Sequence, residues 1–258
     1  MNDTKCPPFL EPRLRLFLSA DIVGSTSLKQ VRLKTSYDGS DIEQGPKWFS
    51  AIQGFYFEAS QAFLTEWSKR AESSADKDRL YGEPPRFWKS VGDEVLFTKI
   101  LTDYQQLVTT LHCWLTAVKR MRVFLKAESP ALDVKCTAWT AGFPFFNREV
   151  VIGNRNPHSA PIEDYFRASG EMLNTHYENI DSSDVSVDYI GPSIDTGFRL
   201  TGHSSSRKMV LSIDAAYLVS MTNFDGELAR LDLYYEGAFS LKGVIGGAPY
   251  PVFWINMS

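Results

Sequence analysis

Apolar and polar positions along the chain predict alternating strands and helices. Residues 14–22 alternate and then run apolar, which predicts a central strand, and a Gly-Ser-Thr turn follows it. From 48 to 67, aromatic and aliphatic residues recur at helical spacing, and Pro46 suits the first turn of that helix. Residues 86–100 predict two short strands joined by a Gly-Asp turn. A second helix is expected over 103–126, where apolar side chains share one face.

The second half of the chain predicts shorter elements around a polar interruption. A strand is expected to end at Gly142, and the polar stretch from about 154 to 183 is interpreted as an insertion. A strand, a Gly-Pro turn and the start of a helix follow over 185–200. Three short strands are expected near 208–212, 233–236 and 251–255. The order β-α-β-β-α-β of the first two-thirds predicts a ferredoxin-like α+β fold, an antiparallel sheet with helices on one face. We expect one domain over 1–258, with its core from about 13 to 258.

Composition and charge narrow the functional classes. With 258 residues, of which 43% are hydrophobic, the chain can bury a full core. Its net charge of −4 leaves no diffuse basic surface, so we expect neither nucleic acid nor a membrane as a partner. No stretch approaches the roughly 20 apolar residues of a membrane helix. Cys6, Cys113 and Cys136 form neither a disulfide framework nor a metal-ligand spacing, which fits a cytoplasmic location.

Two aspartates at the ends of apolar strands are candidates for chemistry. Asp21 follows LFLSA, and Asp93 lies in the turn VGDEV. Each alone also fits a structural role, Asp21 as a strand-end cap and Asp93 as a hairpin-turn residue. In a βαββαβ sheet, however, the end of the first strand is adjacent to the turn between the second and third strands. Both carboxylates can therefore converge on two Mg²⁺ or Mn²⁺ ions, which would activate a ribose 3′-hydroxyl and neutralise the phosphates that it attacks.

Small residues follow the first aspartate directly. Gly24, Ser25 and Thr26 leave room for backbone N–H groups to approach phosphate oxygens at the start of a helix or turn. Such a triplet alone is a weak signal. Because it begins three residues after a strand-end aspartate, it predicts a binding site for a triphosphate.

Four segments resemble, in order, the motifs of class III adenylate and guanylate cyclases. They read FLSADIVGST, KSVGDEVLF, DYIGPSIDTGFRL and LKGVIGGAPYPVFWI, and they extend from about residue 15 to the end of the sequence. The resemblance implies a cyclase catalytic domain that makes a 3′,5′-cyclic monophosphate with the help of two divalent cations. It also implies a role for each matching residue: Asp21, Asp93 and the Ile22 carbonyl for the cations; Val23, Gly24, Ser25, Thr26 and Lys242 for the triphosphate; Lys89 and Asp188 for the base; and Arg199 for the α-phosphate.

The same resemblance implies a homodimer in which each site draws on both chains. The metal carboxylates come from one subunit, whereas the base-reading residues and the arginine come from the other, around a two-fold axis. One position departs from the pattern, because Asp195 stands where the family has an asparagine that orients the ribose. Asp195 either takes that catalytic role as a hydrogen-bond acceptor or is an exposed residue in a first helical turn. For Arg199 and Lys242 the alternative is a solvated surface charge.

The base-reading pair leaves the nucleotide open, since a donor lysine and an acceptor carboxylate suit adenine, uracil and cytosine alike. In its organisation the chain resembles the stand-alone pyrimidine cyclases of bacterial Pycsar antiphage systems. This implies UTP, then CTP, as substrate, and a separate effector protein that reads the product. An adenylate cyclase that uses ATP is one alternative, and an inactive cyclase-like regulatory module is another. A pyrimidine pocket needs bulk where a purine's second ring would lie. The first predicted helix offers it at Trp48, Phe49, Phe55 and Tyr56.

Overall fold

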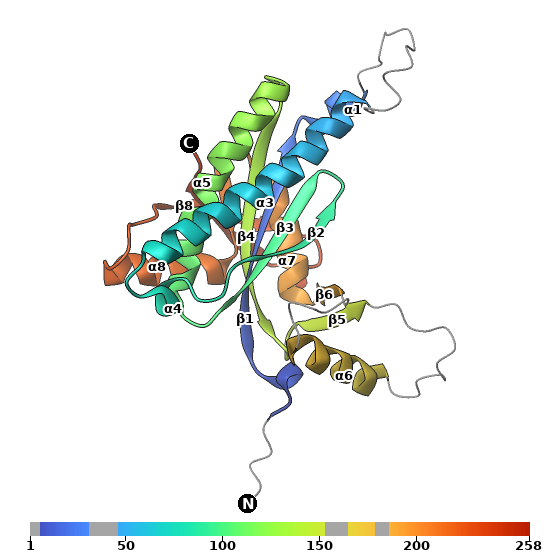
Figure 1. Cartoon of the computed structure of the whole chain (residues 1–258), viewed down its shortest axis with the longest axis vertical. Coiled ribbons are helices and arrows are strands. Elements are labelled where there is room, and N and C mark those ends of the chain that lie inside the picture. The colour runs from blue at the N-terminus through green and yellow to red at the C-terminus, as the bar shows by residue number, and fades with distance from the viewer. Residues whose placement is uncertain (1–5, 31–45, 153–164, 179–185) are drawn as a thin grey trace, which may run out of the picture.

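A seven-stranded sheet forms the centre of the computed structural model, which describes residues 6–30, 46–152, 165–178 and 186–258. Its strands are β1 (Arg13–Val23), β2 (Arg86–Val91), β3 (Glu94–Leu101), β4 (Asp133–Phe143), β7 (Lys208–Leu211), β8 (Leu233–Ser240) and β9 (Pro249–Asn256). They lie in the order β2-β3-β1-β4-β7-β9-β8 (Figure 1). The first four strands in this order form the predicted ferredoxin-like core, and the other three extend it.

Strand β1 lies within the sheet and defines the register of its neighbours. It pairs antiparallel with β3 and β4, so that Asp21 lies opposite Glu94 on one side and Lys135 on the other. Alternate residues of a strand point to opposite faces of the sheet. Leu18 accordingly enters the main core, whereas Phe17 enters a second core on the other face. Because both faces are covered, the strand reads as a continuous apolar run in its middle.

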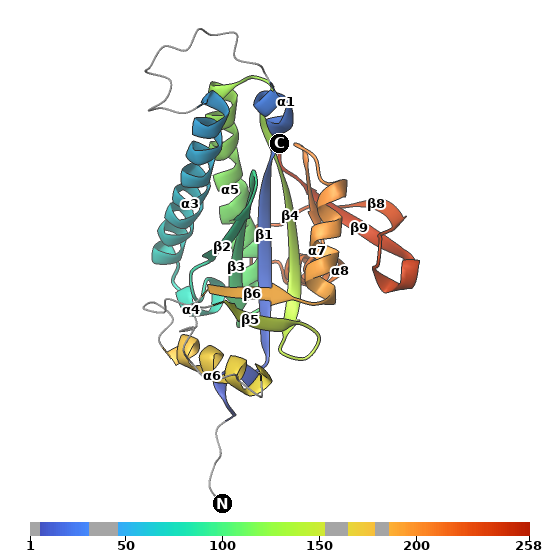
Figure 2. The same cartoon turned by 90° about the vertical axis from the view of Figure 1, so that its right-hand side faces the viewer.

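Three helices cover one face of the sheet. They are α3 (Lys47–Ser73), α5 (Gln105–Glu128) and α8 (Ile213–Asp225). Figure 2 shows α3 and α5 side by side on the same side of β1. The ring of Phe63 in α3 lies edge-on to Phe97 of β3 and to Trp114 of α5, with centroid distances of 5.3 and 4.8 Å. The prediction of two long amphipathic helices is confirmed.

A smaller layer covers part of the opposite face. It consists of the two-stranded sheet β5 (Arg148–Ile152) and β6 (Ser186–Ile190) and of helix α7 (Pro192–Leu200), which Figure 2 shows across β1 from α3. Helix α7 packs closely because Gly197 has no side chain; a Cβ atom there would overlap the Trp139 ring. The structure thus adds a helix on the second face, and it pairs β4 with β7 in parallel. A parallel pair requires a long crossover, which the segment from β5 to α7 provides.

Helix α6 (Tyr165–Glu178) falls within the stretch that the sequence suggests as an insertion. Residues 154–164 and 179–183 of that stretch lie outside the described residues. The helix packs against the short 3₁₀ helix η1 (Pro8–Leu10), so it contacts the chain just before β1.

A buried charge cluster ties α6 and β5 to β1. Arg15 of β1 donates to Glu149 of β5 at 2.9 Å and to the Tyr177 hydroxyl of α6 at 2.8 Å. Its guanidinium also lies 5.0 Å from the ring centre of Tyr189 in β6. Because a buried charge is costly unless it is paired, these contacts fix the two-stranded β5–β6 sheet relative to β1.

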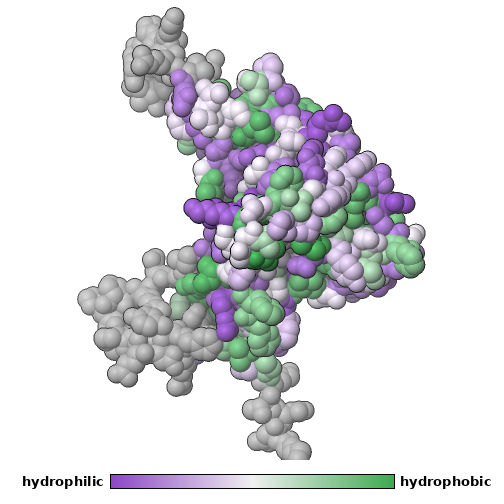
Figure 3. Space-filling model, turned by 180° about the vertical axis from the view of Figure 1, so that it is seen from behind, coloured by the Kyte–Doolittle hydropathy of each residue, from purple (hydrophilic) through white to green (hydrophobic). Residues whose placement is uncertain are grey.

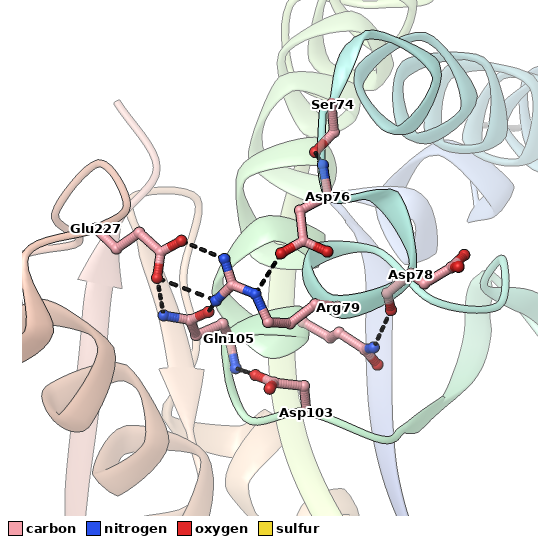
Figure 4. A network of polar contacts seen from close by, with 8 residues as sticks. Ser74, Asp76, Asp78, Arg79, Asp103, Gln105 and Glu227 are labelled. Carbon is pink, nitrogen blue, oxygen red and sulfur yellow. Dashed lines mark hydrogen bonds and ion pairs between the residues drawn. The ribbon is translucent and has the colours of Figure 1, made fainter.

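A polar network joins α4, the start of α5 and the loop after α8 (Figure 4). It is centred on Arg79 of α4 (Lys77–Leu80), whose guanidinium contacts Asp76 at 2.6 Å and Glu227 at 3.0 Å. Gln105, at the start of α5, donates to the same Glu227 carboxylate at 2.9 Å. Exposed ion pairs contribute little stability, so the network mainly fixes the loop after α8 against α4.

The remaining short elements are α1 (Ser25–Gln30), η2 (Thr201–His203) and η3 (Ile245–Gly247). Seen from the α7 side, the surface mixes hydrophilic and hydrophobic residues (Figure 3). None of the described helices has the length and apolar character needed to cross a membrane.

Candidate active site

The predicted adjacency of Asp21 and Asp93 is present in the structure. Asp21 lies near the end of β1, and Asp93 lies in the turn between β2 and β3. The Asp93 carbonyl accepts a hydrogen bond from the Ile22 amide at 3.3 Å. Asp21 is paired across the strands with Glu94, the residue that follows Asp93. The two carboxylates therefore lie at the same edge of the sheet.

The Asp21 carboxylate is partly buried and contacts Lys135 Nζ at 3.0 Å. Burial raises the pKa of Asp21 above its usual value, because removal from water disfavours the charged form. Lys135 acts in the opposite direction, and the neighbouring charge of Asp93 raises the pKa of Asp21 further. An added cation would therefore stabilise the ionised form of Asp21.

Asp93 has a different set of partners. Ser25 donates a hydrogen bond to its Oδ2 atom, and Lys29, one turn later in α1, lies 3.1 Å from its Oδ1 atom. Burial alone would raise the pKa of Asp93, but the bonds from Ser25 and Lys29 outweigh it and hold that pKa below its usual value. The turn is also fixed to α3, since the Tyr56 hydroxyl donates to the Gly92 carbonyl.

These carboxylates fit a hard divalent cation. Among the described residues, no group of three or more His, Cys, Asp or Glu side chains is placed to hold a metal ion. The protein would therefore supply two side-chain ligands, Asp21 and Asp93. Two carboxylates suit Mg²⁺ or Mn²⁺, because Mg²⁺ keeps several waters and takes substrate phosphates as further ligands. Glu94 adds negative charge nearby: its Oε1 atom is buried without a hydrogen bond to the described residues, and burial raises its pKa.

Gly24 turns the chain from β1 into α1. Its φ of +90° is left-handed, and a Cβ atom would lie 2.8 Å from the Ala131 carbonyl oxygen, so the position requires glycine. The first amides of a helix have no partner within it. The segment 23–26, predicted to bind the triphosphate, contains the start of α1, and Ser25 in it contacts Asp93 directly.

The two predicted base-reading residues contact each other. Lys89 of β2 donates to Asp188 Oδ1 of β6 at 2.7 Å, and the same oxygen accepts the Tyr189 amide at 2.9 Å. The ammonium also lies 4.2 Å from the ring centre of Trp88. The two side chains are 33% and 30% exposed, so a ligand can reach the pair.

Arg199, Asp195 and Lys242 are exposed. Arg199 and Asp195 lie one turn apart on α7, and Lys242 lies in the turn after β8. Within the described chain, no hydrogen bond or ion pair links these three side chains to Asp21 or Asp93. Asp195 occupies the first turn of α7, as its structural alternative predicts.

A cavity of about 570 Å³ lies beside the Asp93 turn. Its lining residues are Lys29, Trp48, Phe49, Ile52, Gln53, Tyr56 and Gly92. Three of the four aromatic residues considered as the wall of a pyrimidine pocket therefore border this cavity. Phe55 does not, because it is fully buried in the main core.

Sequence reasoning missed Lys29 and Lys135, which contact the two aspartates. It named Tyr56 only as a pocket wall and did not predict its contact with the Gly92 carbonyl. Lys135 reaches Asp21 from a neighbouring strand, so it becomes visible only when the register is known. The position of Lys29 could have been inferred from its spacing to Ser25. Lys29 follows Ser25 by four residues, and this spacing places two side chains on one face of a helix.

Neither a protein-family model nor a curated protein matches this sequence. Solved structures do match the fold of the chain. The adenylyl cyclase CyaB from P. aeruginosa matches with a TM-score of 0.58 at 12% identity, over 95% of this chain and 94% of that one. The guanylate cyclase domain of RhGC from Catenaria anguillulae, solved with GTP, gives 0.57 at 10% identity, over 95% and 97%. The chain has the fold of a nucleotide cyclase catalytic domain.

A further guanylyl cyclase structure shares this fold. The guanylyl cyclase domain of the RhoGC fusion protein from Blastocladiella emersonii, described as a non-canonical dimer, has a TM-score of 0.53 at 9% identity, over 95% of this chain and 97% of that one. Because both adenylyl and guanylyl cyclases match the chain over most of its length, the cyclase fold does not select a base.

Proposed function

We propose that this chain is a metal-dependent nucleotide cyclase that converts a nucleoside triphosphate into a 3′,5′-cyclic monophosphate and diphosphate. The observation that carries the proposal is the adjacency of the Asp21 and Asp93 carboxylates at one sheet edge in a cyclase fold. The structural alternatives for these residues, a strand cap and a turn residue, explain each one separately but not their adjacency.

In the reaction, the ribose 3′-oxygen attacks the α-phosphorus, its hydroxyl proton is released and diphosphate leaves. Asp21, Asp93 and the Ile22 carbonyl would hold two divalent cations, Mn²⁺ or Mg²⁺. When bound, such cations lower the pKa of the attacking hydroxyl and neutralise phosphate charge. The amides of segment 23–26 and the exposed ammonium of Lys242 would bind the triphosphate.

Groups from a second copy of the chain would complete each site. Arg199 would stabilise the charge that develops on the α-phosphate, and Asp195 would orient the ribose by accepting a hydrogen bond. Both are exposed on α7 and are not joined to the metal carboxylates within the described chain. A two-fold dimer with sites at the interface accounts for this separation.

A pyrimidine substrate, UTP before CTP, is our proposal for the base. The contact between Lys89 and Asp188 supports one binding unit with a donor and an acceptor, which uracil can satisfy through a carbonyl and N3–H. The resemblance to Pycsar cyclases supports a role in antiphage defence in the cytoplasm, with the product read by a separate effector protein. An adenylate cyclase remains the alternative for the same site.

Product analysis tests the function directly. Purified protein with Mn²⁺ is offered each of the four nucleoside triphosphates separately, and the products are resolved by chromatography. We expect a cyclic monophosphate from UTP, and a loss of on the order of 10²-fold or more in Asp21→Asn and Asp93→Asn. Asp232→Asn, a matched change at a side chain that is 71% exposed, should retain activity. If no triphosphate is converted, the inactive regulatory module replaces this proposal.

A further inference from the structure

Lys29 contacts Asp93 although it lies outside the four cyclase-like motif segments. It belongs to the last turn of α1, and its Nζ atom lies 3.1 Å from Asp93 Oδ1. Its side chain is 34% exposed and borders the cavity beside the turn. Lys29 therefore stands between the carboxylate and open space.

Both oxygens of Asp93 have partners in α1. Ser25 donates to Oδ2, and Lys29 pairs with Oδ1. A divalent cation that binds Asp93 must replace the ammonium, since two positive charges a few ångströms apart repel each other strongly. The flexible, partly exposed lysine side chain can then move away. The triphosphate that accompanies the cation supplies a new anion for it.

We propose that Lys29 exchanges partners during substrate binding: it pairs with Asp93 in the absence of nucleotide and with the triphosphate once a divalent cation occupies Asp93. This inference rests on the proposed function and assigns Lys29 as a further binding residue of that site. The exchange opposes binding of the cation alone and favours binding of cation and triphosphate together. Cation and triphosphate are thereby coupled, each improving the site for the other.

Binding measurements without turnover test the exchange. The variant Lys29→Met removes the charge and keeps much of the side-chain length. Mn²⁺ binding is measured by electron paramagnetic resonance in protein without nucleotide, and binding of inorganic triphosphate at saturating Mn²⁺ is measured by calorimetry. In Lys29→Met we expect the affinity for Mn²⁺ to rise about threefold to tenfold and the affinity for triphosphate to fall by a similar factor. Lys29→Arg, which keeps the charge, should stay near the wild type in both.

Two controls separate this effect from bulk charge and from the fold. Lys119→Met makes the same charge change at an exposed position of α5 and should alter neither affinity. In an Asp93→Asn background, Lys29→Met should no longer increase Mn²⁺ affinity. The inference is overturned if Lys29→Met leaves Mn²⁺ affinity unchanged, or if both affinities fall together. Opposite shifts in a protein without cyclase activity would refute the proposed reaction and leave the partner exchange standing.

Discussion

Two inactive variants, mixed together, test whether each active site is shared between chains. Asp93→Ala removes a metal carboxylate, and Arg199→Ala removes the group proposed for the α-phosphate. Each should lower turnover by on the order of 10²-fold or more, because each loses charge stabilisation of the transition state. In a two-fold dimer with shared sites, both substitutions of a heterodimer fall in the same site, and the other site keeps its native Asp93 and Arg199.

The expected recovery follows from the geometry of such a dimer. Free exchange of equal amounts gives roughly half heterodimers, each with one intact site of two, so the mixture should regain about a quarter of wild-type turnover per chain. Cyclic product is measured by chromatography after subunit exchange. Chains with different tags allow native mass spectrometry to confirm that heterodimers have formed.

A matched mixture provides the control. Asp93→Ala mixed with Asp21→Ala places both lesions among the metal ligands, so each heterodimer site lacks one carboxylate and activity should stay low. Heterodimers of Asp93→Ala and Arg199→Ala that form but remain inactive would refute the shared site. Equal recovery in both mixtures would refute it as well.

Three further substitutions probe packing, turn geometry and base choice. Gly197→Ala should lower the free energy of unfolding by about 1–3 kcal/mol, because the added Cβ overlaps the Trp139 ring. Thermal melting measures this loss, and Gly202→Ala, where a Cβ meets nothing within 4 Å, is the control. Tyr56→Phe should weaken Mn²⁺ binding severalfold, since the Gly92 carbonyl loses its donor, and equal affinity would show that this bond does not position the turn. Phe49→Ala should raise turnover of ATP or GTP relative to UTP, and an unchanged ratio in a four-substrate assay would contradict the proposed wall.

Local patterns were sufficient for the parts of the fold that consist of one continuous segment. Strand β1, the β2–β3 hairpin and helices α3 and α5 were predicted because burial follows their own periodicity. The adjacency of Asp21 and Asp93 also followed, since a βαββαβ order brings the first strand end to the hairpin turn.

Contacts between distant segments could not be predicted in the same way. The pair between Lys135 and Asp21 depends on the register of β1 against β4, which are separated by about a hundred residues of sequence that encode no register locally. The position of α7 on the second face of the sheet depends on the crossover from β4 to β7. The apolar periodicity of α7 shows that one side of the helix is buried, but not which face of the sheet it covers. Phe55 and Phe49 show the same limit, because both are aromatic on α3 but only Phe49 lines the cavity.

The contact between Lys89 and Asp188 has a consequence for base selection in the site proposed above. The two groups satisfy each other at 2.7 Å, so an incoming base competes with a ligand that the protein itself provides. A base with one acceptor and one donor in register replaces both halves of the ion pair. A base that matches only one half leaves a charged group without its partner, and an unsatisfied charge costs more than a lost neutral hydrogen bond. In the proposed base site, the closed pair would therefore disfavour any base that matches only one of its two groups.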